Sequence, residues 1–239
     1  VIGRDQWESC AEPDRSNRIV TGHAFAVDVN PDRTWGSIAV AGQRADGLWQ
    51  FAVVEHARRT DWILDRCEKL AAEYPGAPFV VLARGPAGNL IAELTERGLR
   101  VIEASGADYG VACSGFFDAV THGAARYPDA QPELGEALAG ARKNSQEENA
   151  WTWSRKASTS PDISPLVAVT LGLWGAMAAE SEFATVLFPG RPDPDEAEAA
   201  EREALGPQAP QVITPEDYTT CFRCSTGSSC PLHDGAASP

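Results

Sequence analysis

The stretch HAFAVDVNPDRTWGSIAVAG, residues 23–42, decides the fold of this chain. Apolar residues run up to Asp28, the turn-forming segment NPDRT follows, and apolar residues resume at Ile38. This pattern predicts two antiparallel strands joined by a short turn. A carboxylate in the middle of a buried strand needs a physical reason, because burying a charge without a partner is costly.

The segments after this stretch extend the predicted sheet. LWQFAVVEH follows the turn former QRADG, so we expect a three-stranded antiparallel meander. Helical spacing of apolar residues then alternates with short buried strands, in the order helix 60–74, strand 78–83, helix 87–98 and strand 99–104. This alternation predicts parallel strands connected by right-handed crossovers, added to the meander.

The rest of the chain divides into three parts. We expect helices over 108–126 and 132–143, a strand or hairpin arm over 150–159, and a buried helix within 160–180. Residues 181–215 are acidic and rich in proline, which is typical of a linker. We therefore predict an α/β domain over 1–180, a linker over 181–215 and a Cys/His-rich tail over 216–239.

Composition excludes some functions. The net charge of −14 argues against broad nonspecific attraction to DNA or anionic lipid. The longest apolar run, 165–179, is shorter than the roughly 20 residues that span a bilayer, so we expect no membrane partner. The scattered cysteines make a poor disulfide framework, which indicates a reducing cytoplasm. The chain opens on Val1 without a secretory signal, and we expect it to be a piece of a longer polypeptide.

Three antiparallel strands followed by alternating helices and strands is the element order of the RNase H-like fold, in which the middle of the first strand carries an aspartate at the open face of the sheet. Hydrolysis of a phosphodiester uses Mg²⁺ or Mn²⁺, which prefer oxygen ligands. Asp28 is placed for this role, and Asp162 stands at the first turn of the buried helix. Asp162 could equally stabilise that helix N-terminus, and Asp28 could be a partly exposed strand residue.

Several segments together resemble the C-terminal nuclease half of tailed-phage terminase large subunits, especially those of phages that infect actinobacteria. The segments are DQWESC, DVNPDRTWGSIAVAG, GPAGNLIAELTERGLRV, ACSGFFDAV and WTWSRKASTSPDISPLVAVTLGLWG, in family order over residues 5–176. No single one of these segments is specific for the family, but their occurrence together in this order is.

The resemblance implies an RNase H-like endonuclease that cuts concatemeric phage DNA by two-metal phosphodiester hydrolysis. It also implies an ATPase domain upstream, partners in the portal and the small terminase subunit, and a location in the host cytoplasm during phage assembly. This chain has no G-x-x-x-x-G-K-[ST] motif, as a separated nuclease domain would not.

Residue by residue, Asp28 matches the metal ligand on the first strand and Asp162 the ligand at the last helix. Asp32 resembles an auxiliary acid just beyond the first strand, or is a turn residue of NPDRT. The family places a middle aspartate where this chain has Ala83, which cannot bind a metal. Glu55 and Glu103 are the other acids that could reach the site, and both could equally be solvated strand ends.

Two further groups are candidates for binding. A local basic rim could position DNA phosphates, formed by Arg33, Arg84, Arg142, Lys143, Arg155 and Lys156. The tail sequence CFRCSTGSSCPLH could bind Zn²⁺ through Cys221, Cys224, Cys230 and His233, or could be a tail with free thiols.

Two functions of different classes follow. The first is a metal-dependent DNA endonuclease, which Asp28, Asp32 and Asp162 favour. The second is a catalytically weakened RNase H-like scaffold that guides DNA or docks the packaging motor on the portal, which Ala83 favours. A resolvase-like nuclease on the same fold fits the motifs less well.

Overall fold

The structure is a computed structural model that describes residues 1–129, 131–145 and 151–187. Within these residues the strands are β1 (Ala11–Glu12), β2 (Ile19–Val29), β3 (Trp35–Arg44), β4 (Trp49–Arg58), β5 (Phe79–Leu82), β6 (Val101–Ala104), β7 (Ala125–Pro128), β8 (Lys143–Ser145) and β9 (Trp151–Trp153). The helices are α1 (Arg4–Glu8), α2 (Ile63–Glu73), α3 (Leu90–Glu96), α4 (Gly106–Thr121), α5 (Pro132–Gly140) and α6 (Ser164–Leu187).

The predicted mixed sheet is confirmed. Seven strands form it in the order β1-β7-β4-β3-β2-β5-β6, and β8 pairs with β9 in a separate hairpin. The antiparallel meander β2-β3-β4 lies at its centre, with β5 and β6 added in parallel beside β2. The first turn of the meander is closed by Arg33 in a left-handed conformation (φ 58), and the second by Gly47 (φ 82).

One edge of the sheet differs from the sequence expectation. The helix predicted over 108–126 ends at Thr121, because Gly123 takes a left-handed conformation (φ 68) that stops it. The residues that follow form β7, which pairs in parallel with β4 and β1. The helix predicted over 132–143 likewise ends at Gly140, and Lys143 belongs to β8.

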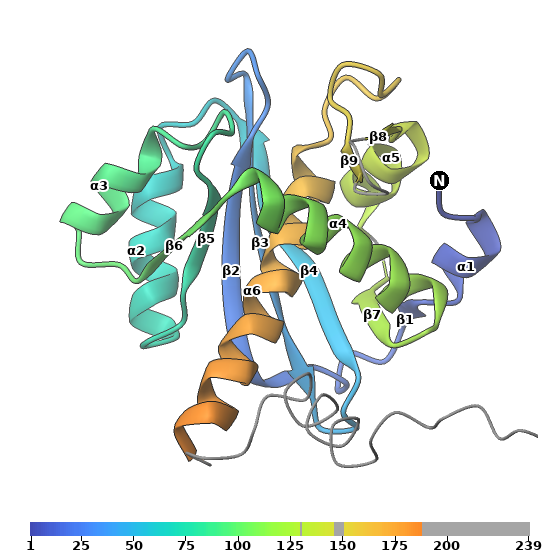
Figure 1. Cartoon of the computed structure of the whole chain (residues 1–239), viewed down its shortest axis with the longest axis horizontal. Helices are drawn as coiled ribbons and strands as arrows, with labels where there is room; N and C mark the ends of the chain where they lie inside the picture. Colours follow the sequence, from blue (N-terminus) through green and yellow to red (C-terminus); the bar gives the residue numbers. More distant parts are fainter. Residues whose placement is uncertain (130, 146–150, 188–239) are drawn as a thin grey trace, which may run out of the picture. The chain divides into compact units, whose positions relative to one another are not determined.

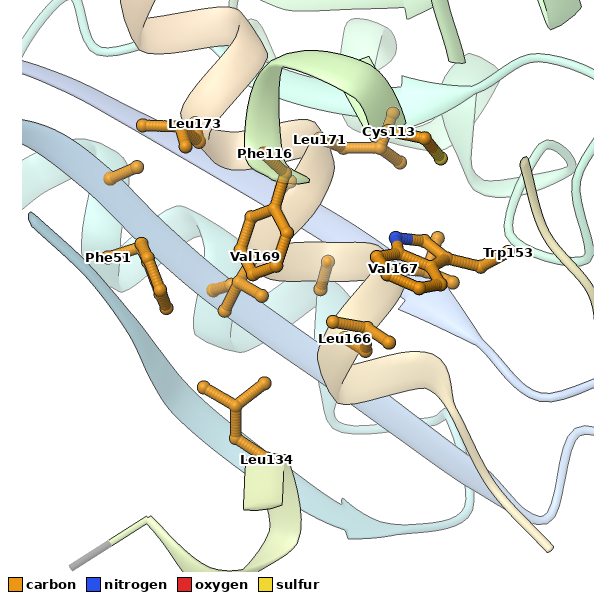
Figure 2. Close-up of a cluster of buried hydrophobic side chains, with 14 of the residues drawn as sticks. Phe51, Cys113, Phe116, Leu134, Trp153, Leu166, Val167, Val169, Leu171 and Leu173 are labelled. Atoms are coloured by element: carbon orange, nitrogen blue, oxygen red, sulfur yellow. The ribbon is translucent and has the colours of Figure 1, made fainter. Parts of the chain in front are cut away.

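Helix α6 covers one face of the sheet, across β2, β3 and β4 (Figure 1). Helices α4 and α5 pack against α6 from outside. Apolar side chains from the sheet, α4, α5 and β9 converge on the first half of α6, and we call this group the α6-side cluster; Figure 2 shows Phe51, Phe116, Leu134 and Trp153 around it. The nearly all-apolar sequence of α6 is explained by this burial.

Helix α6 approaches the sheet closely at one glycine. A Cβ atom on Gly175 would lie 2.4 Å from Cγ2 of Val80 on β5, which is too close for two carbon atoms. The same atom on Gly172 would meet nothing nearer than 3.7 Å. Gly175 therefore sets the distance between the helix and the sheet, whereas Gly172 does not.

Helices α2 and α3 lie against the opposite face of the sheet (Figure 1). Their buried residues pack on alternate residues of the same strands, among them Val27, Ile38 and Val81, and we call this group the α2-side cluster. The sheet is thus buried on both faces, and polar side chains among its strands must be satisfied locally. No helix in the described part of the chain is long and apolar enough to cross a membrane.

Candidate metal centre

A polar row crosses the three strands of the meander near the end that carries the turn between β2 and β3. Strand register pairs Asp28 of β2 with Ser37 of β3, and Ser37 with His56 of β4. Paired residues point to the same face, and Asp28 alternates with Ala24 and Ala26, which belong to the α6-side cluster. We name Asp28, Ser37 and His56 the polar row; it faces the side of the sheet that α6 covers.

A β-bulge decides which residue of β4 joins the polar row. Ala39 pairs with Val53, but Ile38 pairs with Glu55, so Val54 is an extra residue. Unbroken alternation from Val53 would place Glu55 opposite Ser37; the bulge places His56 there instead. Glu55 turns to the other face, where its Oε2 accepts a hydrogen bond of 3.0 Å from Nε of Arg66 on α2. Sequence reasoning missed His56, because nothing in VVEH reveals the bulge.

The side chain of Asp28 is completely buried, and among the described residues only one of its two carboxylate oxygens accepts a hydrogen bond. Its Oδ2 accepts a hydrogen bond of 2.6 Å from Nη2 of Arg155, whereas its Oδ1 makes no hydrogen bond with any described residue. Burial raises the pKa of the Asp28 carboxyl to about 6, against the opposing effect of the Arg155 charge. The nearby Asp162 carboxylate raises this pKa slightly further. A buried carboxylate oxygen without a donor is a position that favours a cation.

Asp162 performs the helix-stabilising role that the sequence allowed. Its Oδ1 accepts the Ser164 backbone N–H at 2.7 Å, and its Oδ2 accepts the Ser164 hydroxyl at 2.9 Å. The same Oδ2 lies 4.0 Å from Nε2 of His56. Asp162 therefore both fixes the start of α6 and faces the polar row.

Asp32 lies in the turn after β2 and is exposed. Its Oδ1 accepts hydrogen bonds from the Thr34 hydroxyl at 2.8 Å and the Thr34 backbone N–H at 3.3 Å, so it acts as a turn residue. A cavity of about 280 Å³ is lined by Asp32, Asp162 and Arg155 together. Asp32 and Asp162 thus line one cavity, whereas Asp28 does not line it and is connected to it through Arg155.

Among the described residues, no acid takes the place of the middle aspartate that the resemblance implies at Ala83. Ala83 follows the last residue of β5, and its exposed methyl group offers no ligand. Glu103 pairs with Val81 of the α2-side cluster, so it lies on the opposite face from Asp28, as Glu55 does. Among the described residues, no group of three or more His, Cys, Asp or Glu side chains is placed to hold a metal.

These donors fit one divalent cation better than two. The unpaired Oδ1 of Asp28 and the carboxylate of Asp162 are the oxygen ligands that Mg²⁺ or Mn²⁺ prefers. Arg155 supplies the only cationic partner that the structure shows for Asp28 within the described residues, and a bound metal would compete with it. The middle ligand that would complete a two-metal site is missing at Ala83.

Two of the six residues predicted to form a basic rim for DNA make contacts within the protein instead. Arg33 donates hydrogen bonds to the carbonyl oxygen of Pro86 at 2.8 Å and to Oδ1 of Asn89 at 2.7 Å, so it ties the first turn to the loop before α3. Arg155 points inward to Asp28. Four exposed members of the set remain, namely Arg84, Arg142, Lys143 and Lys156.

Lys143 of the β8–β9 hairpin lies against two aromatic rings, one from the hairpin and one from α4. Nζ of Lys143 lies 3.9 Å from the ring centre of Trp151 and 4.1 Å from that of Phe117. Trp153 is buried and donates from Nε1 to the Thr170 hydroxyl at 3.0 Å, so it is a packing residue.

The predicted zinc ligands Cys221, Cys224, Cys230 and His233 lie outside the described residues, as do residues 188–215 of the linker predicted over 181–215 and the rest of the tail. Residues 181–187, predicted as the start of that linker, belong instead to helix α6. The zinc site and these boundaries stay predictions. The other three cysteines, Cys10, Cys67 and Cys113, are buried free thiols.

Comparison with known proteins places the fold. The chain is similar to the large terminase of bacteriophage HK97, with a TM-score of 0.57 and 16% sequence identity; the match covers 73% of this chain and 43% of that protein. It is also similar to the large terminase nuclease of thermophilic phage G20c with bound magnesium, with a TM-score of 0.51 and 13% identity over 70% of this chain and 93% of that one.

The structure without magnesium from the same phage matches with a TM-score of 0.50. No family model and no curated protein matches the sequence. The chain therefore has the fold of the large terminase nuclease domains, and spans less than half of the HK97 protein.

Proposed function

We propose that this chain, which has the fold of the large terminase nuclease domains, is the metal-dependent DNA endonuclease domain of a phage packaging terminase. Its substrate is concatemeric viral double-stranded DNA. Two observations support this: the likeness of fold, and the buried Asp28 carboxylate near Asp162, the two acids that the sequence resemblance implies as metal ligands.

The observation that carries the proposal is the state of Asp28. This carboxylate is completely buried, one of its oxygens has no donor among the described residues, and a second carboxylate, Asp162, is close enough to raise its pKa. Hydrogen bonds normally satisfy buried polar groups. A divalent cation bound by Asp28 and Asp162 would satisfy the free oxygen and offset the repulsion between the two carboxylates.

The side chains around this pair have defined roles in the proposal. The bound ion would supply an activated water and stabilise the leaving oxygen. Asp162 is oriented by Ser164, and Asp28 is held rigid by β2, which is paired on both sides. Arg155, which lines the cavity, would move from the carboxylate to a DNA phosphate once the cation neutralises Asp28.

The exposed residues Arg84, Arg142, Lys143 and Lys156 would contact the DNA backbone without reading bases. Two-metal hydrolysis stays a prediction, and its second ion would lack a ligand at Ala83. The partners that follow from the proposal are an upstream ATPase domain, the portal and the small terminase subunit, met in the host cytoplasm during phage assembly.

One observation favours a second function. The Asp28–Arg155 pair satisfies part of the site without any metal, and Ala83 leaves it short of an acid. A catalytically weakened scaffold that guides DNA or docks the motor on the portal would keep such a pair permanently.

Plasmid cleavage separates the two functions. The chain is incubated with supercoiled plasmid and Mg²⁺ or Mn²⁺, beside Asp28→Asn, Ala83→Asp and the control Asp118→Asn, an exposed residue of α4. The nuclease predicts cleavage by the wild type and the control, none by Asp28→Asn, and faster cleavage by Ala83→Asp. DNA binding without cleavage by the wild type and Ala83→Asp would contradict it and favour the scaffold.

A further inference from the structure

A pair of side chains lies next to the polar row, on the same face of the sheet and closer to the ends of the strands. Strand register pairs Trp35, the first residue of β3, with Arg58, the last residue of β4. Side chains two positions apart on a strand share a face, so Trp35 and Arg58 lie on the face of Ser37 and His56. This is also the face that carries Asp28.

The Trp35 ring is fixed by its neighbours, and the Arg58 guanidinium lies over it. The ring stacks on His56, with ring centres 4.7 Å apart and planes inclined by 11°. The Trp35 backbone N–H donates to Oδ1 of Asn30 at 2.9 Å, and Asn30 lines the same cavity as Asp162. The Cζ atom of Arg58 lies 5.2 Å from the centre of the Trp35 ring, within cation–π distance. Arg58 is therefore held beside the candidate metal centre.

The charge of Arg58 has no counter-charge among the described residues. Its side chain is exposed, and no ion pair or hydrogen bond joins its guanidinium to any residue of 1–129, 131–145 or 151–187. The neighbouring Arg59, by contrast, donates to Oδ2 of Asp61 at 2.7 Å. An arginine stacked on an aromatic ring keeps the N–H donors of its plane available for bidentate binding of a phosphate. Arg58 is thus positioned but not neutralised, as an anion-binding side chain needs to be.

Arg58 and Arg84 lie on opposite sides of Asp28 at one end of the sheet. Strands β4, β2 and β5 run in the same direction, because β3 is antiparallel to β2 and β4, and β5 is parallel to β2. Arg58 ends β4, Asp28 is the next-to-last residue of β2, and Arg84 follows β5. In the sheet order β4-β3-β2-β5, a spacing of about 4.8 Å per strand places the ends of β4 and β5 roughly 14 Å apart. A phosphate backbone laid across these strand ends would meet both arginines, with Asp28 between them.

We propose that Arg58, held over Trp35, binds a phosphate of the DNA backbone beside the centre of Asp28 and Asp162. The proposal rests on the proposed function for DNA as the ligand. Arg58 holds the backbone on the β4 side of the centre, and Arg84 holds it on the β5 side. A phosphate contact positions DNA without reading its bases, so Arg58 contributes to affinity and not to sequence preference.

Binding of a fluorescently labelled duplex oligonucleotide to the full chain, measured by anisotropy in EDTA, tests the proposal without any metal. Arg58→Gln should raise the Kd about fivefold to tenfold at low salt, and reduce the slope of log Kd against log salt concentration by about 1. Arg58→Lys keeps the charge and should keep the slope. The matched control is Arg15→Gln, which removes the same charge from an exposed residue before β2, at the opposite end of the sheet, and should change neither quantity.

A folded Arg58→Gln variant that binds the duplex with unchanged affinity and slope would overturn the proposal. An equal loss of affinity in Arg15→Gln would also overturn it, because net charge alone would then explain both results. A measurement on the wild type avoids dependence on any variant. In NMR spectra the indole N–H signal of Trp35 should shift when the duplex is added, whereas that of the buried Trp7 should not, and an unshifted Trp35 signal would contradict the proposal.

The outcomes also separate this proposal from the proposed function. Metal-dependent cleavage whose KM is unaffected by Arg58→Gln would leave the nuclease standing and overturn the role of Arg58. Metal-free DNA binding that depends on Arg58, in a chain that cuts no DNA, would support the phosphate contact and overturn the nuclease. A wild type that binds no duplex would overturn both.

Discussion

Nη2 of Arg155 lies 2.6 Å from Oδ2 of Asp28, although the two residues are 127 positions apart in the sequence. Arg155 follows the β8–β9 hairpin, and Asp28 is the next-to-last residue of β2, not in the middle of the strand as the sequence pattern predicted. The pair therefore links the hairpin end of the chain to the sheet, and places a positive charge on the carboxylate that we propose to bind a metal. The contribution of this ion pair to stability can be measured, and so can its separation when a metal binds.

Replacing Arg155 with glutamine should destabilise the protein in a pH-dependent way. The folded-state pKa of Asp28, about 6, lies above its ordinary value of 3.8, so the carboxyl is protonated in the fold at pH 5 and ionised at pH 8. Loss of the counter-charge matters only for the ionised form. We expect the free energy of unfolding to fall by about 3 kcal/mol at pH 8, and by about 1 kcal/mol or less at pH 5.

Urea denaturation at both pH values measures this difference, with Arg142→Gln as the control because Arg142 is exposed. An equal loss of stability at pH 5 and pH 8 would show that Arg155 acts through packing and not through the Asp28 charge.

Metal binding should weaken in acid. A cation needs the ionised form of Asp28, and a proton competes for the same oxygens below pH 6, where the raised pKa keeps the carboxyl neutral. We expect Mn²⁺ affinity to be nearly constant above pH 7 and to fall by up to about tenfold per pH unit below 6. Calorimetry at pH 5 and pH 7.5 checks this, and equal affinities would exclude Asp28 as a ligand.

Two glycines of α6 should respond oppositely to alanine. Gly175→Ala forces a methyl group against Val80 and should lower the free energy of unfolding by about 1–3 kcal/mol. Gly172→Ala meets only ordinary contacts, and should leave stability unchanged or raise it by up to about 1 kcal/mol through helix propensity. Thermal denaturation of both variants tests the closeness of α6 to the sheet; similar effects would contradict it.

The sequence predicted the centre of the fold well, because alternation and turn residues are local signals. The meander that carries Asp28 and the helix that begins after Asp162 are both confirmed. Strand β7 was missed because its four residues follow a helix without a distinct pattern. Its formation depends on pairing with β4 and β1, which no local signal encodes.

The candidate site was predictable only in part, for a related reason. Asp28 interrupts an apolar strand and Asp162 precedes an apolar helix. A charged residue in such apolar surroundings can be recognised from the sequence. His56 enters the site through a bulge, and Arg155 through the placement of the hairpin. Neither event changes the pattern of apolar and polar residues, so both required the structure.

The most direct test of the account is a crystal structure of the chain soaked in Mn²⁺, with anomalous diffraction to locate the ion. The account predicts a peak bound by carboxylate oxygens of Asp28 and Asp162, with Arg155 moved away from Asp28. Saturating Mn²⁺ with no peak there and an intact Asp28–Arg155 pair would contradict the claim that this centre holds a catalytic metal.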